Sequence, residues 1–256
     1  MPDIYSYPSA KSVVVCGDIH GEFLTLVHKM CVQYNMHDTL VIVAGDCGFG
    51  FEKQGYYDNI YRRIQKRLAA HNCWIAMVRG NHDNPAYFSE QLIHYERFRT
   101  VPDYSVIEAC AHRILCIGGA LSIDRRVRLE EMIRRSFAKN CYWADEMPVY
   151  SPDKLNEIAA TDIHIDTVIT HTAPSFCEFV LKHGLDYWAQ TDAALLCDSQ
   201  TERQTMDAIL AHLRRDGHPL THWYYGHFHQ SWHSEIEGIF YTMLDIMEFH
   251  EVTPIE

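Results

Sequence analysis

Five short apolar segments of this chain are each followed at once by Asp, Asn or His, which are residue types that can bind metal ions. This repeated layout constrains the fold more strongly than any other feature of the sequence. In the stretch 39–50, the apolar run 40–44 is followed at once by Gly45 and Asp46. Unbroken runs rich in β-branched residues are typical of strands buried on both faces. Ligand sites in open α/β folds gather at the carboxyl ends of such strands. We therefore expect Asp46 to face a cleft.

The same layout recurs at four other places in the chain. The apolar runs lead into Asp18 and His20, into Asn81, His82 and Asp83, into His171, and into His227 and His229. An Asp-x-His block places a carboxylate oxygen near an imidazole nitrogen, and a His-x-His block in extended chain points both rings to one side. Each block alone is a weak signal, but five in one chain predict a metal site. Two neighbouring divalent ions need a group that reaches both, and we assign this bridge to the Asp46 carboxylate.

Length and composition favour a single domain over residues 1–256. The chain has 256 residues, of which 47% are hydrophobic, enough to fill one core. Its formal net charge of −12 argues against broad binding of nucleic acid. The oligomeric state is left open by these numbers.

Targeting signals and cysteine usage predict a cytoplasmic protein. No apolar run approaches the ~20 residues needed to span a bilayer, and residues 1–12 do not have the pattern of a signal peptide. The nine cysteines include no Cys-x-x-Cys pair and lie mostly in apolar segments, so we expect reduced thiols in the core.

Apolar periodicity adds helices between these strands. Spacing typical of helices predicts them over 22–34, 58–71, 152–161 and 201–214, with a short one over 85–91. The arginine-rich stretch 122–136 is also expected to contain a helix. Residues 97–117 instead form short strand-like runs, which indicate a sheet edge or a second sheet with antiparallel neighbours. Residues 176–199 mix aromatic and polar side chains without a clear period, and we interpret them as a lid over the site.

Taken together, the strand-terminal blocks resemble the calcineurin-like metallophosphoesterase superfamily. This resemblance implies an α/β fold in which two mixed β-sheets form a sandwich flanked by helices, with four layers in the order αββα. It also implies two divalent ions. One ion would be held by Asp18, His20, Asp46 and His229, and the other by Asp46, Asn81, His171 and His227. Mixed oxygen and imidazole ligands suit manganese, iron or zinc.

A further stretch is similar to one bacterial and phage branch of the superfamily, whose substrates are mostly unassigned. It consists of Gly-Gly-Ala at 118–120, Ser-Ile-Asp at 122–124, Tyr-Trp at 142–143 and Glu146.

The resemblance implies a metal-dependent phosphoric ester hydrolase. A water or hydroxide held between the ions would attack phosphorus in line, because two cations lower its pKa. His82 would protonate the leaving oxygen, and the neighbouring Asn81 would anchor its loop and contact the substrate. The alternative for His82 is a plain hydrogen bond to a backbone carbonyl.

One departure from the superfamily concerns phosphate binding. Protein serine/threonine phosphatases of this superfamily carry an Asp-Arg pair where this chain has Phe49 and Gly50. We therefore expect Asp83 to orient His82 and Arg128 to bind the substrate phosphate. The alternative for Arg128 and its neighbouring arginines is a solvated helix face.

Three classes of function follow, in order of preference. The first is a phosphomonoesterase, and the second is a phosphodiesterase or dinucleoside polyphosphate hydrolase. The third is a scaffold without catalysis, which has no chemical need for seven metal-type ligands.

Overall fold

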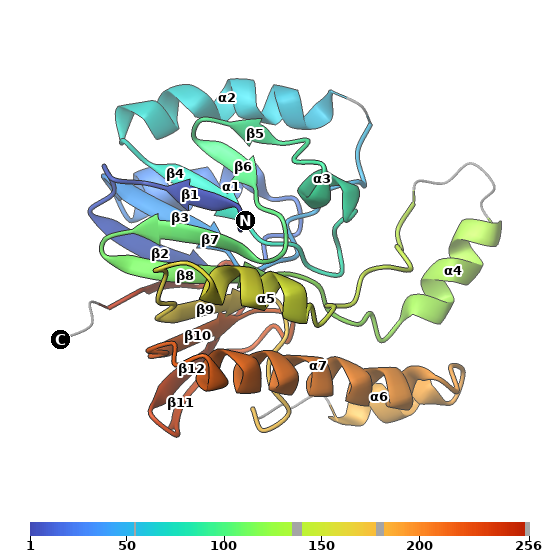
Figure 1. Cartoon of the computed structure of the whole chain (residues 1–256). Helices are drawn as coiled ribbons and strands as arrows, with labels where there is room; N and C mark the ends of the chain where they lie inside the picture. The colour runs from blue at the N-terminus through green and yellow to red at the C-terminus, as the bar shows by residue number, and fades with distance from the viewer. Residues whose placement is uncertain (54, 135–139, 178–181, 254–256) are drawn as a thin grey trace.

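Two mixed β-sheets stack face to face, and helices cover their outer faces (Figure 1). The computed structural model describes residues 1–53, 55–134, 140–177 and 182–253. The layers follow the order helix, sheet, sheet, helix, and this confirms the expected α/β sandwich. Within the described ranges, none of the helices combines the length and apolarity needed to cross a bilayer.

The first sheet has six strands, of which the central four run parallel. Its order is β13 (Phe249–Glu251), β2 (Ser12–Cys16), β3 (Thr39–Val43), β4 (Trp74–Met77), β6 (Phe98–Thr100) and β5 (His94–Tyr95). The two edge strands, β13 and β5, are antiparallel to their neighbours. Its outer face packs against α1 (Phe23–His28), the π-helical turn η1 (Lys29–Gln33), α2 (Tyr56–Ala70) and α3 (Ala86–Ser89).

The second sheet has seven strands and is also mixed. Its order is β1 (Ile4–Ser6), β7 (Ser105–Ala109), β8 (His112–Ile117), β9 (Thr167–Thr170), β10 (His222–Tyr225), β12 (Ile239–Met243) and β11 (Trp232–Ile236). Helices α5 (Pro152–Ala159) and α7 (Leu195–Arg215) cover its outer face. Helix α6 (Lys182–Ala189) lies beside α7, and α4 (Arg125–Arg134) projects from the same end of the sandwich (Figure 1).

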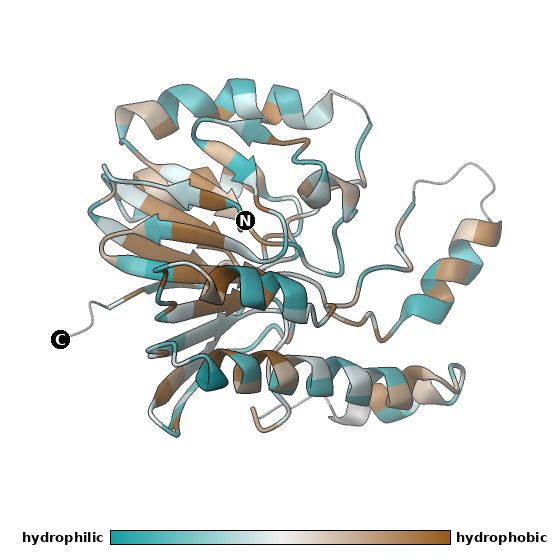
Figure 2. Cartoon of the chain, in the orientation of Figure 1, coloured by the Kyte–Doolittle hydropathy of each residue, from teal (hydrophilic) through white to brown (hydrophobic). Residues whose placement is uncertain are grey.

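Alternation along the central strands divides their side chains between two cores. In β3, Leu40 and Ile42 pack between the sheets, whereas Val41 and Val43 pack against the helices. Both faces are therefore apolar, and Figure 2 shows these strands as a hydrophobic centre. Full burial of each such side chain contributes about 1.5–3 kcal/mol.

The structure differs from the expected elements mainly at their ends. The helix expected over 22–34 changes to a π-helical turn at Lys29, and α7 begins at Leu195 rather than at 201. The strands β1 and β5 were not expected, because runs of three and two residues carry too little pattern. Residues 135–136 of the expected helix and 178–181 of the expected lid lie outside the described residues.

The strand register brings the ends of several strands to one edge. Cys16, Val43 and Met77 are neighbours across β2, β3 and β4, and Ile169 and Tyr224 are neighbours across β9 and β10. The loops that follow these five strands carry all the blocks identified in the sequence. These five loops therefore start close enough together for their side chains to form one site.

Candidate metal centre and its pocket

Four of the expected ligands form one compact cluster. Ligand atoms of Asp18, His20, Asp46 and His229 all lie within 4.8 Å of one another. The His229 Nε2 atom lies 3.0 Å from Asp18 Oδ2 and 3.1 Å from His20 Nε2. This is the set expected for the first ion.

Of the other three expected ligands, His171 contacts the same carboxylate, and Asn81 and His227 adjoin His171. His171 Nε2 lies 3.0 Å from Asp46 Oδ1 and 3.1 Å from Asn81 Oδ1. The rings of His171 and His227 have centroids 5.0 Å apart. The structure therefore brings all seven residues together, with Asp46 placed between the two groups.

A main-chain contact orients the His171 ring. Its Nδ1 donates to the carbonyl oxygen of Ala44 at 2.7 Å, and this turns Nε2 toward Asp46. Metal-ligating histidines usually donate their second ring nitrogen in this way. Arg203 supports the same loop, because it donates to the Thr172 hydroxyl at 2.8 Å and to the Ala173 carbonyl at 2.9 Å.

A chain of side chains orients Asn81. Its Nδ2 donates to Ser122 Oγ at 2.9 Å, and Ser122 Oγ donates in turn to Glu146 Oε2 at 2.6 Å. The Asn81 amide oxygen consequently points toward His171 and the centre. Ser122 and Glu146 belong to the stretch that resembles the bacterial and phage branch, and this contact gives that stretch a physical role.

Two glycines allow the loops to approach the carboxylates closely. A Cβ added at Gly226 would lie 2.2 Å from Asp18 Oδ1, and one at Gly80 would lie 2.2 Å from Asp46 Oδ1. Larger residues would therefore displace the carboxylates. Four expected ligands also adopt the left-handed conformation, with φ of 44° at His20, 46° at Asp46, 72° at His227 and 51° at His229. Such residues are uncommon outside glycine and cluster at functional sites.

The electrostatics of the centre favour added positive charge. Asp18 and Asp46 are 0% and 1% exposed. Burial lowers the pKa of His171, but Asp46 and Asp18 outweigh it and raise that pKa to about 10. Burial opposes ionisation of Asp46, yet His171 and other nearby imidazoles hold its pKa well below the ordinary range. Two carboxylates, one amide oxygen and four imidazoles are a donor set that fits two divalent cations.

Asp83 has a different role from the one expected. Its Oδ1 accepts from the main-chain N–H of Gly48 at 2.7 Å and Phe49 at 2.8 Å, and its Oδ2 accepts from Cys47 at 3.0 Å and Gly80 at 2.8 Å. The fully buried carboxylate therefore joins the loop after β3 to the loop after β4 and does not orient the His82 ring. Burial and the nearby Asp46 raise its pKa to about 7, against the lowering effect of the N–H donors.

His82 faces a cation. Arg128 Nη2 lies 2.6 Å from His82 Nε2, and Arg128 Nε donates to Asp124 Oδ1 at 2.8 Å. The His82 main-chain N–H donates to Asp46 Oδ1 at 2.7 Å, and this places the residue beside the centre. Burial lowers the pKa of His82, and Arg128 adds to this effect while Asp46 opposes it. Arg128 thus lines the pocket, and its phosphate-binding role stays a prediction.

Positions 49 and 50, where this chain differs from the serine/threonine phosphatases, leave no room for an arginine. Phe49 is fully buried, and its ring packs among other aromatic rings, including Phe23 and Tyr57. Gly50 has a φ of 101°, and a Cβ there would lie 2.5 Å from the Asn84 side chain and 2.8 Å from Trp143. The loop after β3 is therefore built around an aromatic core.

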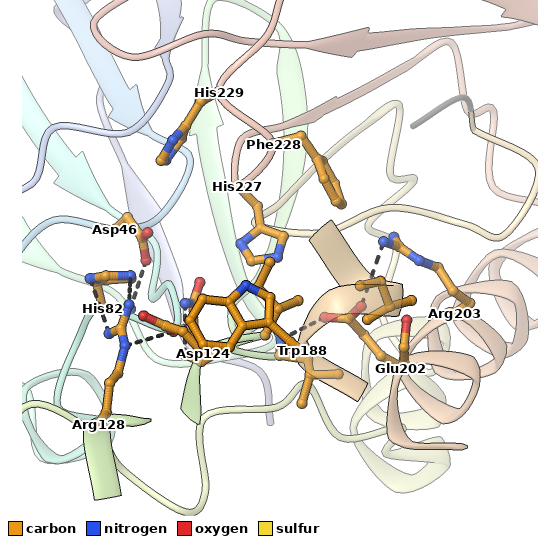
Figure 3. A pocket seen from close by; sticks show the side chains of 16 residues that line it. Asp46, His82, Asp124, Arg128, Trp188, Glu202, Arg203, His227, Phe228 and His229 are labelled. Carbon is orange, nitrogen blue, oxygen red and sulfur yellow. Dashed lines mark hydrogen bonds and ion pairs between the residues drawn. The ribbon is translucent and has the colours of Figure 1, made fainter. Parts of the chain in front are cut away.

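A cavity of about 450 Å³ adjoins the centre (Figure 3). Besides expected site residues, it is lined by Leu121, Ser122, Ile123, Asp124, Leu185, Trp188, Ser199, Glu202, Arg203 and Phe228. Most of these were not identified as site residues from the sequence. Phe228 had a signal, since it stands between the two histidines of the last block. Leu185, Trp188 and Ser199 fall in the stretch 176–199 that was interpreted as a lid, whereas Glu202 and Arg203 on α7 had no signal.

Arg125 joins two elements that border this cavity. Its guanidinium pairs with Asp192 at 2.6 Å and Asp198 at 2.7 Å, and these partners lie between α6 and the first turn of α7. Arg126, the next residue, is exposed and pairs with Glu130. Arg125, Arg126 and Arg128 of α4 therefore differ in their surroundings. Arg125 joins α4 to the start of α7, Arg126 lies on the surface, and Arg128 lies beside His82.

Comparison with known proteins gives one extensive family match. A model of the calcineurin-like phosphoesterases matches residues 11–231, which include every block of the centre. Three solved structures are distantly similar. Phosphopantetheinyl hydrolase from Mycobacterium tuberculosis is 15% identical, with 96% of this chain and 97% of that chain covered and a TM-score of 0.44. TT1561 of Thermus thermophilus is 10% identical (95% and 98% covered, TM-score 0.46), and a dimetal phosphatase from Danio rerio is 13% identical (94% and 88%, TM-score 0.48).

Proposed function

Since the chain belongs to the calcineurin-like phosphoesterase family and is a metal-dependent phosphoester hydrolase, we propose that it hydrolyses phosphomonoesters. The observation that carries this proposal is the position of Arg128, which lines the pocket beside His82 and is held by Asp124. A guanidinium fork matches two oxygens of a terminal phosphoryl group. A monoester dianion has more charge and more free oxygens to offer than a diester.

We assign two divalent ions to the centre, with the ligands as the sequence predicts them. Asp18, His20, Asp46 and His229 would hold one ion, and Asp46, Asn81, His171 and His227 would hold the other. When bound, the ions would supply Lewis acidity and a water of lowered pKa. The left-handed loop residues and the buried hydrogen bonds of Asp83 keep these side chains in place before the ions arrive.

His82 is the proposed general acid, and Arg128 prepares it for that role. Arriving phosphate offers the Arg128 donors a better acceptor than the His82 ring, which frees Nε2. The phosphate charge also raises the pKa of the ring, so that it takes up a proton. In the reaction, the oxygen of water bonds to phosphorus, the ester P–O bond breaks, and His82 gives its proton to the departing oxygen. The products are an alcohol and inorganic phosphate.

The test compares two substrates that share a leaving group. With manganese present, kcat/KM for p-nitrophenyl phosphate should exceed that for bis(p-nitrophenyl) phosphate. The reverse order would assign the protein to the phosphodiesterases or dinucleoside polyphosphate hydrolases, which are the second candidate. A metal-loaded sample that hydrolyses neither compound would contradict the proposed function and favour a scaffold.

Three further proposals concern the identity of the metals, the location of the protein in the cell and the lid over the site. We propose manganese, iron or zinc as the resident metals, because all three accept mixed oxygen and imidazole ligands. All nine cysteines are free thiols, and together with the sequence this supports a cytoplasmic location. Residues 176–199 remain our proposed lid, since Leu185, Trp188 and Ser199 line the pocket.

A further inference from the structure

The pocket beside the centre has two chemically different sides. Expected metal ligands, His82 and Arg128 provide polar groups, whereas five apolar residues line the remainder together with Ser122, Asp124, Ser199, Glu202 and Arg203 (Figure 3). The five apolar residues are Leu121, Ile123, Leu185, Trp188 and Phe228. A phosphoryl group interacts only with the polar side. The apolar side is therefore available to the leaving group of the substrate.

Helix α6 presents one face to this pocket. Leu185 and Trp188 are three residues apart, so they lie on the same side of the helix, and both line the cavity. Tyr187, between them, is 66% exposed and lies on another face. A Cβ at Gly184 would meet Ile123 Cδ1 at 3.5 Å, an ordinary contact distance. Leu185 and Trp188 of α6 and Ile123 of the loop before α4 thus form one apolar wall of the pocket.

Trp188 is the largest group on this wall, and it is only half-buried. Its indole lines the cavity without filling it. A cavity of about 450 Å³ falls within the ~300–1,000 Å³ range of small-molecule sites and exceeds what a phosphoryl group alone occupies. A flat aromatic surface beside such a space favours a flat partner, since aromatic rings pair by offset stacking or edge contact.

We propose that the leaving group of the natural phosphomonoester carries a planar aromatic ring that packs on Trp188. This proposal rests on the proposed function and names the substrate class for the same site. Nucleoside monophosphates and aryl phosphates share this chemistry. Stacking of a base on an aromatic side chain is worth ~5- to 150-fold in affinity.

The experiment compares adenosine 5′-monophosphate with ribose 5-phosphate. Both release the same primary alcohol of ribose, so they differ only in the base. We expect kcat/KM to be about 10- to 100-fold higher for the nucleotide. The Trp188→Ala variant should lose this preference, because KM for the nucleotide rises more than KM for ribose 5-phosphate. Trp188→Phe should restore most of the preference, because it keeps a ring. Leu196→Ala, at a 50% exposed position of α7, is the control and should retain the preference.

Two further measurements separate the outcomes. Hydrolysis of O-phosphotyrosine identifies the source of the ring. If Trp188→Ala impairs this hydrolysis and spares that of the nucleotide, the leaving group is a phenol, and the shared proposal still holds. Calorimetric binding of adenosine, which needs no turnover, should weaken in Trp188→Ala if the ligand is a nucleoside. Equal kcat/KM for both ribose compounds, with no substrate sensitive to Trp188→Ala, would overturn the inference. Failure to hydrolyse any monoester would instead contradict the proposed function.

Discussion

Arg128 Nη2 lies 2.6 Å from Nε2 of His82, although the two residues are 46 positions apart in the sequence. A guanidinium can only donate hydrogen bonds, so the nearby His82 nitrogen accepts and the ring is neutral in this arrangement. Asp124 holds the other edge of the guanidinium. The proposed phosphate-binding group and the proposed general acid are therefore in direct contact before substrate binds.

The first prediction concerns metal content. The purified wild-type protein should contain two divalent ions per chain, measured by elemental analysis. Asp46→Asn should lose at least one of them and abolish turnover, because the substitution removes a charge that both ions require. Asp145→Asn, at an exposed position, is the matched control and should keep both ions and activity. An active wild-type sample with at most one ion per chain would rule out the two-ion centre.

The second prediction concerns proton transfer by His82. His82→Asn should keep both ions and lower kcat by about 10²–10⁴-fold on a substrate with a poor leaving group. The loss should be far smaller with p-nitrophenolate, which departs readily without a proton. The measurement is kcat across esters of graded leaving-group pKa. An equal loss on good and poor leaving groups would exclude His82 as the general acid.

The third prediction concerns Arg128. Arg128→Ala should raise KM and lower kcat/KM by about 10- to 100-fold at full metal occupancy, since hydrogen bonds to charged groups are worth ~1.5–3 kcal/mol. Arg128→Lys should recover little, because lysine lacks the planar fork. Arg126→Ala removes an exposed arginine from the same helix and should behave like the wild type. Unchanged kinetics in Arg128→Ala would return this arginine to a structural or surface role.

The fourth prediction concerns the buried Asp83 carboxylate. Asp83→Asn keeps the size of the side chain but replaces one acceptor oxygen with an NH₂ group. Two of the four main-chain N–H donors would then face a donor, so the free energy of unfolding should fall by about 1–3 kcal/mol or more. Denaturant titration measures this loss, and elemental analysis should show weaker metal retention. Wild-type stability in Asp83→Asn would mean that these hydrogen bonds do not hold the two loops.

The fifth prediction concerns Glu146 and pH. Burial raises the pKa of this carboxyl from 4.5 to about 7, although the hydrogen bonds from Ser122 oppose the shift. Between these two values the folded protein binds the proton more tightly than the unfolded chain does. The contribution of Glu146 to stability is therefore present below about pH 4.5 and is lost as the pH rises to about 7. The measurement is the free energy of unfolding of the wild type minus that of Glu146→Gln. This difference should fall as the pH rises from about 4.5 to about 7. A pH-independent difference would show that Glu146 titrates normally.

The ligand blocks could be predicted from the sequence because each is local. The strand 40–44 and Asp46 are joined within a few residues, and both faces of that strand are apolar, which marks it as central. Parallel strands then bring the following loops to one edge without any further information. The sandwich itself was implied by the resemblance to the superfamily. Local patterns failed at β1 and β5, which are only three and two residues long.

Side-chain partners that belong to different elements were decided by the tertiary structure. Asp83 follows His82 directly, but it turns away from that ring because four buried N–H groups need an acceptor. Trp188 falls in the stretch interpreted as a lid, but its side chain reaches the pocket because α6 packs beside α7. Sequence alone therefore determined which metal-type side chains stand at the strand ends. Only the packing of helices that are remote in sequence decided which charges and rings surround them, because burial and hydrogen-bond satisfaction are properties of the whole fold.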